Sequence, residues 1–308
     1  MDLAYRPMGA ADVEPCLCLV EGEYADHPGV FPHAAGTCRR LLAEGRLNSM
    51  VLEDRSRPPG ERFAAFGLTA FVSPEFLAGL VREAHPDPAA LVVALTRRGE
   101  SPVLSLDAIR RANSGAGLSL LVLHYAEDVQ RLMPAVLESV RQQQPETFLY
   151  VHAGYNLREV VREVRNAGQI PSLQGSGFQI RAERDGRWLV GITREEAQER
   201  PGCYAAAIFR YVPPRFYFKP HEQELLQRAL LDEADGEIAA ALNLSPSAVK
   251  KRWAAIYDRA SAVAPALFSE PPHEARPEAR RGQEKRRPLL RYLRQHPEEL
   301  RPAMPPAP

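Results

Sequence analysis

Two adjacent prolines, Pro213 and Pro214, separate two parts of the chain that differ in their pattern of apolar residues. Before them, apolar runs of strand length alternate with segments whose apolar residues recur at helical spacing. After them, the apolar patterns through residue 268 are all helical. Because proline breaks helices and cannot donate a hydrogen bond to a sheet, the pair favours a domain boundary. The sequence therefore predicts an α/β domain over residues 1–213 and an all-α domain over residues 214–268, which a chain of 308 residues can accommodate.

The α/β part contains apolar runs, turn signals and helical patterns in a definite order. Short apolar runs and a turn at Asp185-Gly186 predict strands over residues 49–54, 62–73, 118–126 and 148–155 and a hairpin over residues 177–192. Helical spacing predicts helices over residues 126–144 and 156–168, the second beginning at Asn156 and ending at Gly168. The charged residues of the second helix, Glu159, Glu163, Arg158, Arg162 and Arg165, are expected to form a salt-bridged solvent face. His124 and His152 lie inside apolar runs, which favours buried and hydrogen-bonded histidines over catalytic bases.

Composition excludes several kinds of protein. The four cysteines have no C-x-x-C spacing, so neither a metal site nor a disulfide framework is predicted. No apolar run approaches the roughly 18 residues of a membrane span, and a cytoplasmic location without a membrane partner is expected. The net charge is zero, but residues 250–294 hold 12 basic and five acidic residues. A basic C-terminal part indicates a polyanionic partner.

Three helical patterns follow the prolines, over residues 222–233, 235–244 and 245–267. Ser245 is a predicted N-cap with Pro246 in the first turn, so the last two helices are joined by a short turn, as in a helix-turn-helix. Val249, Trp253, Ile256 and Ala260 recur at helical spacing and are expected in the core. The remaining residues, 269–308, are predicted to form a basic tail rich in proline and arginine, with a linker over residues 270–283 and a short helix after it.

Residues 218–260 resemble the LuxR-type helix-turn-helix of transcriptional regulators. The resemblance includes Pro220, Glu222, the run from Glu237 to Ala239, and the positions of Ser245 and Val249. It implies double-stranded DNA as the partner, a homodimer on paired half-sites, and a helix over about residues 245–260 in the major groove. The residues expected to contact DNA are Ser245, Ser247, Lys250, Lys251, Arg252 and Arg259, and arginines of the tail (Arg286, Arg287, Arg291 and Arg294) are expected either to add phosphate contacts or to remain solvated.

The order of elements before residue 213 resembles the fold of GCN5-related N-acetyltransferases. The resemblance places the run at 118–126 and the helix after it at the position of the acetyl-CoA-binding strand and helix. That family holds the pyrophosphate at a glycine-containing turn, whereas this junction reads HYAEDVQRLM and contains no glycine. Its carboxylates, Glu127 and Asp128, are expected to repel a phosphate from this helix end. The resemblance therefore implies an acetyltransferase-like domain without cofactor, which senses a small-molecule effector or mediates dimerisation.

These patterns leave three functions open. The main prediction is a DNA-binding transcriptional regulator with a degenerate acetyltransferase-like domain and no cofactor. The alternative is an acetyl-CoA-dependent N-acetyltransferase in which the C-terminal helices are accessory. The third is an interaction protein whose basic helix binds an acidic partner.

Overall fold

The computed structural model describes residues 2–58, 61–129, 132–268 and 281–305, and the side chains of 281–284 are not among the described groups. The chain divides into two compact units. Unit 1 comprises residues 1–152 and 156–210, and unit 2 comprises residues 153–155 and 211–308. Most of the predicted linker, residues 270–280 of 270–283, lies outside the described residues.

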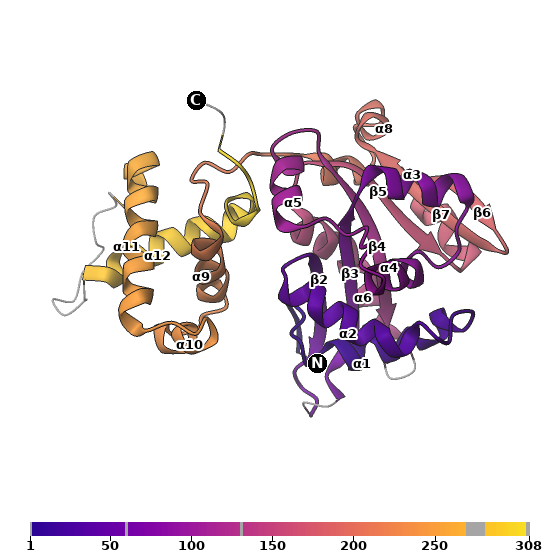
Figure 1. The fold of residues 1–308 in the computed structure, drawn as a ribbon, viewed down its shortest axis with the longest axis horizontal. Helices are drawn as coiled ribbons and strands as arrows, with labels where there is room; N and C mark the ends of the chain where they lie inside the picture. The colour runs from indigo at the N-terminus through magenta and orange to yellow at the C-terminus, as the bar shows by residue number, and fades with distance from the viewer. Residues whose placement is uncertain (1, 59–60, 130–131, 269–280, 306–308) are drawn as a thin grey trace. The chain divides into compact units, whose positions relative to one another are not determined.

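Unit 1 is built on a mixed sheet of seven strands in the order β1-β2-β3-β4-β5-β7-β6 (Figure 1). The strands are β1 (Leu3–Arg6), β2 (Leu47–Asp54), β3 (Phe63–Val72), β4 (Leu118–Glu127), β5 (Leu157–Val164), β6 (Gln179–Arg184) and β7 (Arg187–Thr193). Neighbouring strands are antiparallel except β4 and β5, which are parallel. The β6–β7 hairpin turns at Asp185 and Gly186, both at positive φ, as the sequence predicts.

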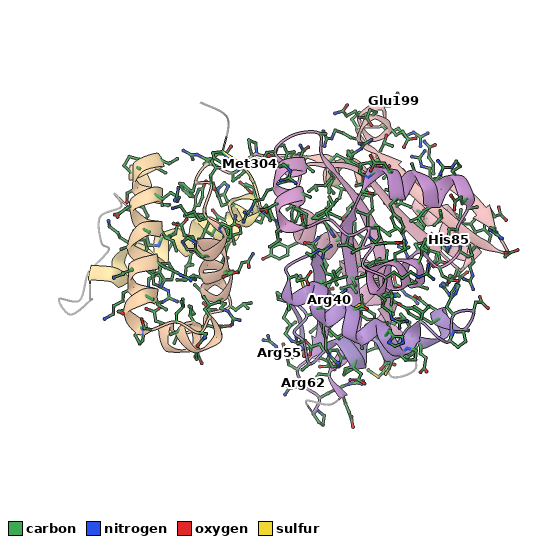
Figure 2. All side chains as sticks on the ribbon, viewed as in Figure 1. Arg40, Arg55, Arg62, His85, Glu199 and Met304 are labelled. Carbon is green, nitrogen blue, oxygen red and sulfur yellow. The ribbon has the colours of Figure 1, made fainter. Side chains whose placement is uncertain are left out.

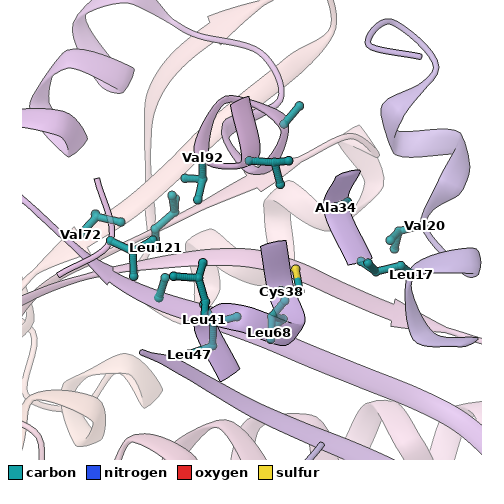
Figure 3. Packing of buried hydrophobic residues seen from close by; sticks show 14 of the residues in the cluster. Leu17, Val20, Ala34, Cys38, Leu41, Leu47, Leu68, Val72, Val92 and Leu121 are labelled. Atoms are coloured by element: carbon teal, nitrogen blue, oxygen red, sulfur yellow. The ribbon is translucent and has the colours of Figure 1, made fainter. Parts of the chain in front are cut away.

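Helices cover both faces of this sheet. The helices of unit 1 are α1 (Val13–Cys18), α2 (Phe31–Ala43), α3 (Pro74–Glu83), α4 (Pro88–Arg97), α5 (Leu106–Asn113), α6 (Pro134–His152), α7 (Ile170–Gly175) and α8 (Arg194–Glu199). On one face, α2 points Ala34, Cys38 and Leu41 toward the buried Leu68 of β3 (Figure 3). Arg40 lies exposed on the outer side of α2 (Figure 2). On the other face, α6 packs Val136 and Val140 against Leu52 and Ala65. Alternate residues of β2 and β3 therefore belong to different cores, because successive strand side chains point to opposite faces.

Two predicted elements of unit 1 are wrong. Residues 148–152, predicted as part of a strand, form the last turns of α6, which continues through Pro145. Residues 157–164, predicted as a helix, form β5 in the middle of the sheet. Asn156 is not a helix cap: its backbone N–H donates to Asn113 Oδ1 at 2.7 Å, which fixes the start of β5. The strands predicted at 49–54, 62–73 and 118–126 are confirmed as β2, β3 and β4.

The described part of unit 2 is helical and contains no strand. Its helices are α9 (Pro220–Leu230), α10 (Asp235–Ala241), α11 (Pro246–Val263) and α12 (Arg281–Gln295). Ser245 caps α11 as predicted, accepting from the N–H of Ala248 at 3.2 Å. The predicted core residues of α11 are buried, and Leu289, Leu290 and Leu293 of α12 join the same cluster. None of the described helices is both long enough and apolar enough to cross a membrane.

Candidate functional site

The most unusual place in the unit 1 sheet is the boundary between β4 and β5. The two strands pair from Leu118 with Leu157 to Val122 with Arg162. Beyond that pair, β4 continues to Glu127 bonded only to β3, and β5 continues to Val164 bonded only to β7. The sheet therefore opens between its two parallel strands. The strand edges that face this opening lack ladder partners, which makes them available to an extended ligand.

An extra residue in β4 marks the start of the opening. Leu68 of β3 pairs with His124 and Thr69 pairs with Val122, so Leu123 has no partner on β3. Such a bulge changes which side chains a strand presents to each face. As a result Val122, His124 and Tyr125 all line one cavity, although a regular strand could not direct all three to the same place.

This cavity lies between the sheet and the helix α6 and has a volume of about 210 Å³. Its walls come from β2, β3, β4, β5, α6 and α7 and from the short helix Tyr204–Phe209. The walls are mostly apolar, with Met50, Leu52, Val122, Phe148 and Val160 among them. A concave, largely apolar cavity with a few polar groups is the usual form of a small-molecule site.

Two buried histidines belong to the cavity lining, and both are hydrogen-bonded as the sequence predicts. His152 contacts Thr69 Oγ1 through Nε2 at 2.9 Å and the carbonyl of Phe148 through Nδ1 at 2.8 Å. His124 contacts Glu23 Oε2 through Nδ1 at 2.9 Å and the Tyr24 hydroxyl through Nε2 at 2.8 Å. A histidine between a carboxylate and a hydroxyl can accept and pass on a proton, so His124 has the contacts of a general base as well as those of a packed side chain.

The charged group of the cavity lining is Arg162 of β5. Its Nε is buried and has no hydrogen-bond partner among the described residues. Burial lowers the pKa of Arg162 from its ordinary value, and the described lining contains no aspartate or glutamate to offset the charge. Burial also raises the pKa of Tyr125, which therefore stays protonated and neutral. Because buried donors in proteins are normally paired, a guanidinium whose buried Nε has no protein partner is available to bind a ligand anion.

The junction between β4 and α6 lacks the glycine of a phosphate-binding turn, and its carboxylates are not as repulsive as the sequence predicts. Glu127 accepts from Arg141 Nε at 2.8 Å and from the Tyr125 hydroxyl at 2.8 Å, so its charge is balanced. Asp128 is buried. The expectation that both carboxylates would repel a phosphate at this helix end therefore does not hold for Glu127.

The residues predicted to contact DNA lie on α11 in unit 2. Lys250 and Lys251 are exposed, and the Ser247 hydroxyl contacts that of Ser245 at 2.9 Å. The two arginines are engaged within the unit. Arg252 donates to the carbonyl of His221 at 3.2 Å, and Arg259 donates to the buried Glu222 at 3.1 Å.

Two of the four tail arginines, Arg286 and Arg294, are engaged within unit 2, whereas Arg287 and Arg291 are exposed. Arg286 pairs with Asp235 at 2.8 Å and lies over the ring of Trp253, and Arg294 pairs with Asp232 at 3.0 Å. These two side chains neutralise acidic residues of their own unit. The positive charge available to a partner on unit 2 is therefore smaller than the excess counted over residues 250–294. Among the described residues, no group of three histidine, cysteine, aspartate or glutamate side chains is placed to hold a metal ion.

Comparison with known proteins gives structural but no sequence relatives. No protein-family model matches the chain, and no curated protein sequence matches it. Solved structures do match, and three of them cover between 62% and 66% of the chain. One is NAA60 of Arabidopsis thaliana in complex with acetyl-CoA, at 16% identity and a TM-score of 0.35, covering 63% of this chain and 99% of that one.

Two further structures are similar at the same level. The ribosomal-protein-S18-alanine N-acetyltransferase of Escherichia coli has 12% identity and a TM-score of 0.34, covering 62% of this chain and 93% of that one. FeeM, an N-acyl amino acid synthase from uncultured soil microbes, has 13% identity and a TM-score of 0.37, covering 66% and 95%. Likeness at these identities concerns the fold alone.

These findings correct the main functional prediction. The strand order of unit 1, with one parallel pair at its centre, gives it the GNAT-like α/β fold that the sequence resembles. Two of the three similar structures are named as an N-acetyltransferase and an N-acyl amino acid synthase and the third contains acetyl-CoA, whereas no finding supports the resemblance to a LuxR-type regulator. The prediction of a DNA-binding transcriptional regulator with double-stranded DNA as its partner is therefore wrong.

The cavity residue Arg162 was not among the predicted site residues, because its segment was predicted as a helix with a solvated, salt-bridged face.

Proposed function

We propose that unit 1 is an N-acyltransferase that uses an acyl-coenzyme A donor. The observation that carries this proposal is the opening between β4 and β5 beside a largely apolar cavity. The pantetheine arm of coenzyme A contains two amide groups in an extended chain. Such a chain can hydrogen-bond to strand edges in the way an added strand does, and the unpaired edges of β4 and β5 offer that site.

The donor's phosphates require a different environment. They fit best at the N-terminus of α6, where free backbone N–H groups and the helix dipole favour anions. Pro134 in the first turn and the absence of a glycine mean that fewer N–H groups can approach closely. The resemblance to acetyltransferases implies acetyl-CoA, and we expect it to bind chiefly through its pantetheine arm.

The acceptor is an amine, which must lose a proton before or during attack on the thioester carbonyl. The His124 pair with Glu23 is suited to take that proton. In the tautomer that donates from Nδ1 to Glu23, Nε2 accepts from the Tyr24 hydroxyl. Tyr24 can pass its proton to Nε2 as it takes one from the amine, and the Glu23 carboxylate then balances the positive charge on His124. Among the described side chains of the cavity and its surroundings, this network is the best-placed base.

We infer that the helical part from residue 214 is accessory to this reaction, with residues 1–213 carrying the site. The sequence resemblance supports a helix-turn-helix arrangement of α10 and α11 as a proposal about fold only. Residues 269–308 are proposed as a tail whose helix α12 completes the apolar cluster of unit 2.

The test uses the full chain, acetyl-CoA and a panel of primary amines, with release of the free coenzyme A thiol as the signal. We expect saturable, amine-dependent release. Glu23→Gln, a partly exposed position, should lower kcat at least tenfold with little change in the KM for acetyl-CoA, since the carboxylate balances the proton rather than binding the donor. Glu21→Gln, in the short helix Glu21–Tyr24 that also contains Glu23, is the matched control. Absence of acetyl-CoA binding by calorimetry would rule the proposal out.

A further inference from the structure

The unpaired guanidinium of Arg162 defines a subsite that the acyl-transfer proposal does not yet use. Arg162 faces the cavity from β5, whereas its neighbour Glu163 belongs to the ion pairs of the opposite side of the strand. The carboxylate that acts on Arg162 through space is Glu23, which already contacts His124. No hydrogen bond or ion pair joins Arg162 to another described residue, so its charge is left for a ligand.

The surroundings of Arg162 restrict the charge of that ligand. His124 and His152 have both ring nitrogens engaged, and Tyr125 donates its hydroxyl proton to Glu127. Asn48, Gln144 and several hydroxyl groups also line the cavity, but Arg162 is the described lining residue with a permanent positive charge, so it is the main charged donor to an anion here. A planar fork of donors matches a carboxylate in two parallel hydrogen bonds, whereas a phosphate dianion needs more positive charge than this lining provides. The lining fits a monocarboxylate.

The cavity restricts the rest of the ligand. Apolar cavities of about 150 Å³ accept benzene, so a cavity of about 210 Å³ has room for an aromatic or branched aliphatic side chain together with a small polar group. Its walls include Val122, which pairs with Arg162, together with Val160 and Phe178. The ligand that satisfies both restrictions has an apolar body and a carboxylate.

The position of Arg162 in the sheet relates this ligand to the reaction. Arg162 pairs with Val122 in the last rung before β4 and β5 separate. A carboxylate held there lies beside the opening in which the acyl group is expected, and an amine one carbon away from the carboxylate would reach the same place. This step rests on the proposed function.

We propose that the acceptor is an apolar α-amino acid, whose carboxylate binds Arg162 while its side chain fills the cavity and its amine faces the opening between β4 and β5. The amine nitrogen would form the new amide bond with the acyl carbon as the bond from that carbon to the coenzyme A sulfur breaks. The ammonium protons pass to the His124 and Glu23 network and to the departing thiolate. The products are an N-acyl amino acid and free coenzyme A.

The experiment compares matched ligands that differ only in the carboxylate: phenylalanine with phenethylamine, and leucine with 3-methylbutylamine. Binding to the full chain is measured by calorimetry without a donor, and acyl transfer is measured separately with acetyl-CoA. We expect each amino acid to bind at least tenfold more tightly than its amine. Arg162→Met, which keeps the length and removes the charge, should abolish this preference and leave the affinity of the amines unchanged. Arg162→Lys should retain part of it.

Arg158→Met, at an exposed position of the same strand, is the matched control and should behave like wild type. A carboxylate preference that survives Arg162→Met, or no preference for either pair in wild type, overturns the subsite. Loss of coenzyme A affinity in Arg162→Met with unchanged amino-acid binding also overturns it, because the guanidinium would then serve the donor. A preference that depends on Arg162 without any acyl transfer keeps the subsite and removes the proposed function. Equal acyl transfer to amines and amino acids keeps the proposed function and removes the subsite.

Discussion

The two faces of the unit 1 sheet are built from the same strands but differ in how completely they are filled. On the face covered by α1, α2 and α4, a large cluster includes Leu41, Val51 and Leu68, all at most 1% exposed. On the face covered by α6, a small cluster around Val136 and Val140 adjoins the cavity. Close packing excludes a ligand, and incomplete packing leaves room for one. Stability is therefore expected to come mainly from the first face and binding from the second.

The same contrast holds for charge on neighbouring residues of β5. Glu163 lies in an ion-pair group with Arg165, Asp87 and Arg187, so each buried charge has partners. Arg162 faces the cavity and has none among the described residues. A protein tolerates an unpaired buried charge only if other interactions offset its cost, which is typical of a functional position.

The largest expected difference between the faces is in the free energy of unfolding that is lost when a leucine is replaced by alanine. Leu68→Ala on the filled face should lower the free energy of unfolding of unit 1 by about 3 kcal/mol, since it creates a new cavity in a packed core. Leu173→Ala, in the half-buried wall of the existing cavity, should cost only about 1 kcal/mol. Urea unfolding followed by circular dichroism measures both. Equal losses would mean that the two faces contribute alike to stability.

Removal of one charged side chain from each face should have opposite effects on the stability of unit 1. Asp87→Asn takes away a carboxylate that is 2% exposed and contacts Arg165, Arg187 and His27, which leaves two arginines without their main partner. We expect a loss of about 2 kcal/mol, below the usual range for buried pairs because both arginines reach solvent. Arg162→Met should be neutral or stabilising by up to about 1 kcal/mol. Thermal melting distinguishes the two, and a clear loss of stability in Arg162→Met would show that its charge is satisfied within the protein.

The two faces should also differ in how stability depends on pH, although this effect is smaller. Burial raises the pKa of Glu163, although Arg165 partly offsets the shift. The folded pKa thus lies above the unfolded value of 4.5, so the contribution of this group to stability is complete below that value and declines as pH rises through the folded pKa. Glu163→Gln should gain stability relative to wild type as pH increases from 4 to 8. Arg162→Met should show no such trend, because arginine stays charged over this range. A gain that instead falls with pH would contradict this prediction.

The sequence predicts most of the filled face but not the cavity, and β5 shows why. Leu157, Val160, Val161 and Val164 are its buried residues, and their spacing equals that of one face of a helix. A central strand buried on both sides can give the same spacing, so periodicity alone could not decide. The signal that could have found the strand is its content of valine, whose branched side chain favours strands. Because the segment was interpreted as a helix, Arg162 was assigned to a solvated face.

Helix α6 was misread for a different reason. Pro145 and the apolar run from Phe148 to Val151 predict a break and a new strand, since proline rarely lies inside a helix. In the structure the helix continues, and Thr147 hydrogen-bonds to the carbonyl of Gln143 at 3.0 Å near the proline. By contrast, β2 and β3 were predicted because their patterns are bounded by turn residues. Local signals were therefore sufficient at the ends of elements, while the cavity depends on contacts between distant segments.

The smallest predicted effect comes from a substitution that narrows the cavity and leaves every charged residue in place. A Cβ added to Gly67 would have only Tyr125 Cδ2 at 4.0 Å in its surroundings, so Gly67→Ala fits without strain and adds a methyl group at the cavity wall. Alanine in a strand should stabilise unit 1 by about 0.5 kcal/mol relative to glycine. Gly36→Ala in α2, where nothing lies within 4 Å, should stabilise by a similar amount. Calorimetry should then show weaker binding of phenylalanine, but not of alanine, for Gly67→Ala alone. If Gly36→Ala weakened phenylalanine binding as much, the ligand site would not be confined to the face covered by α6.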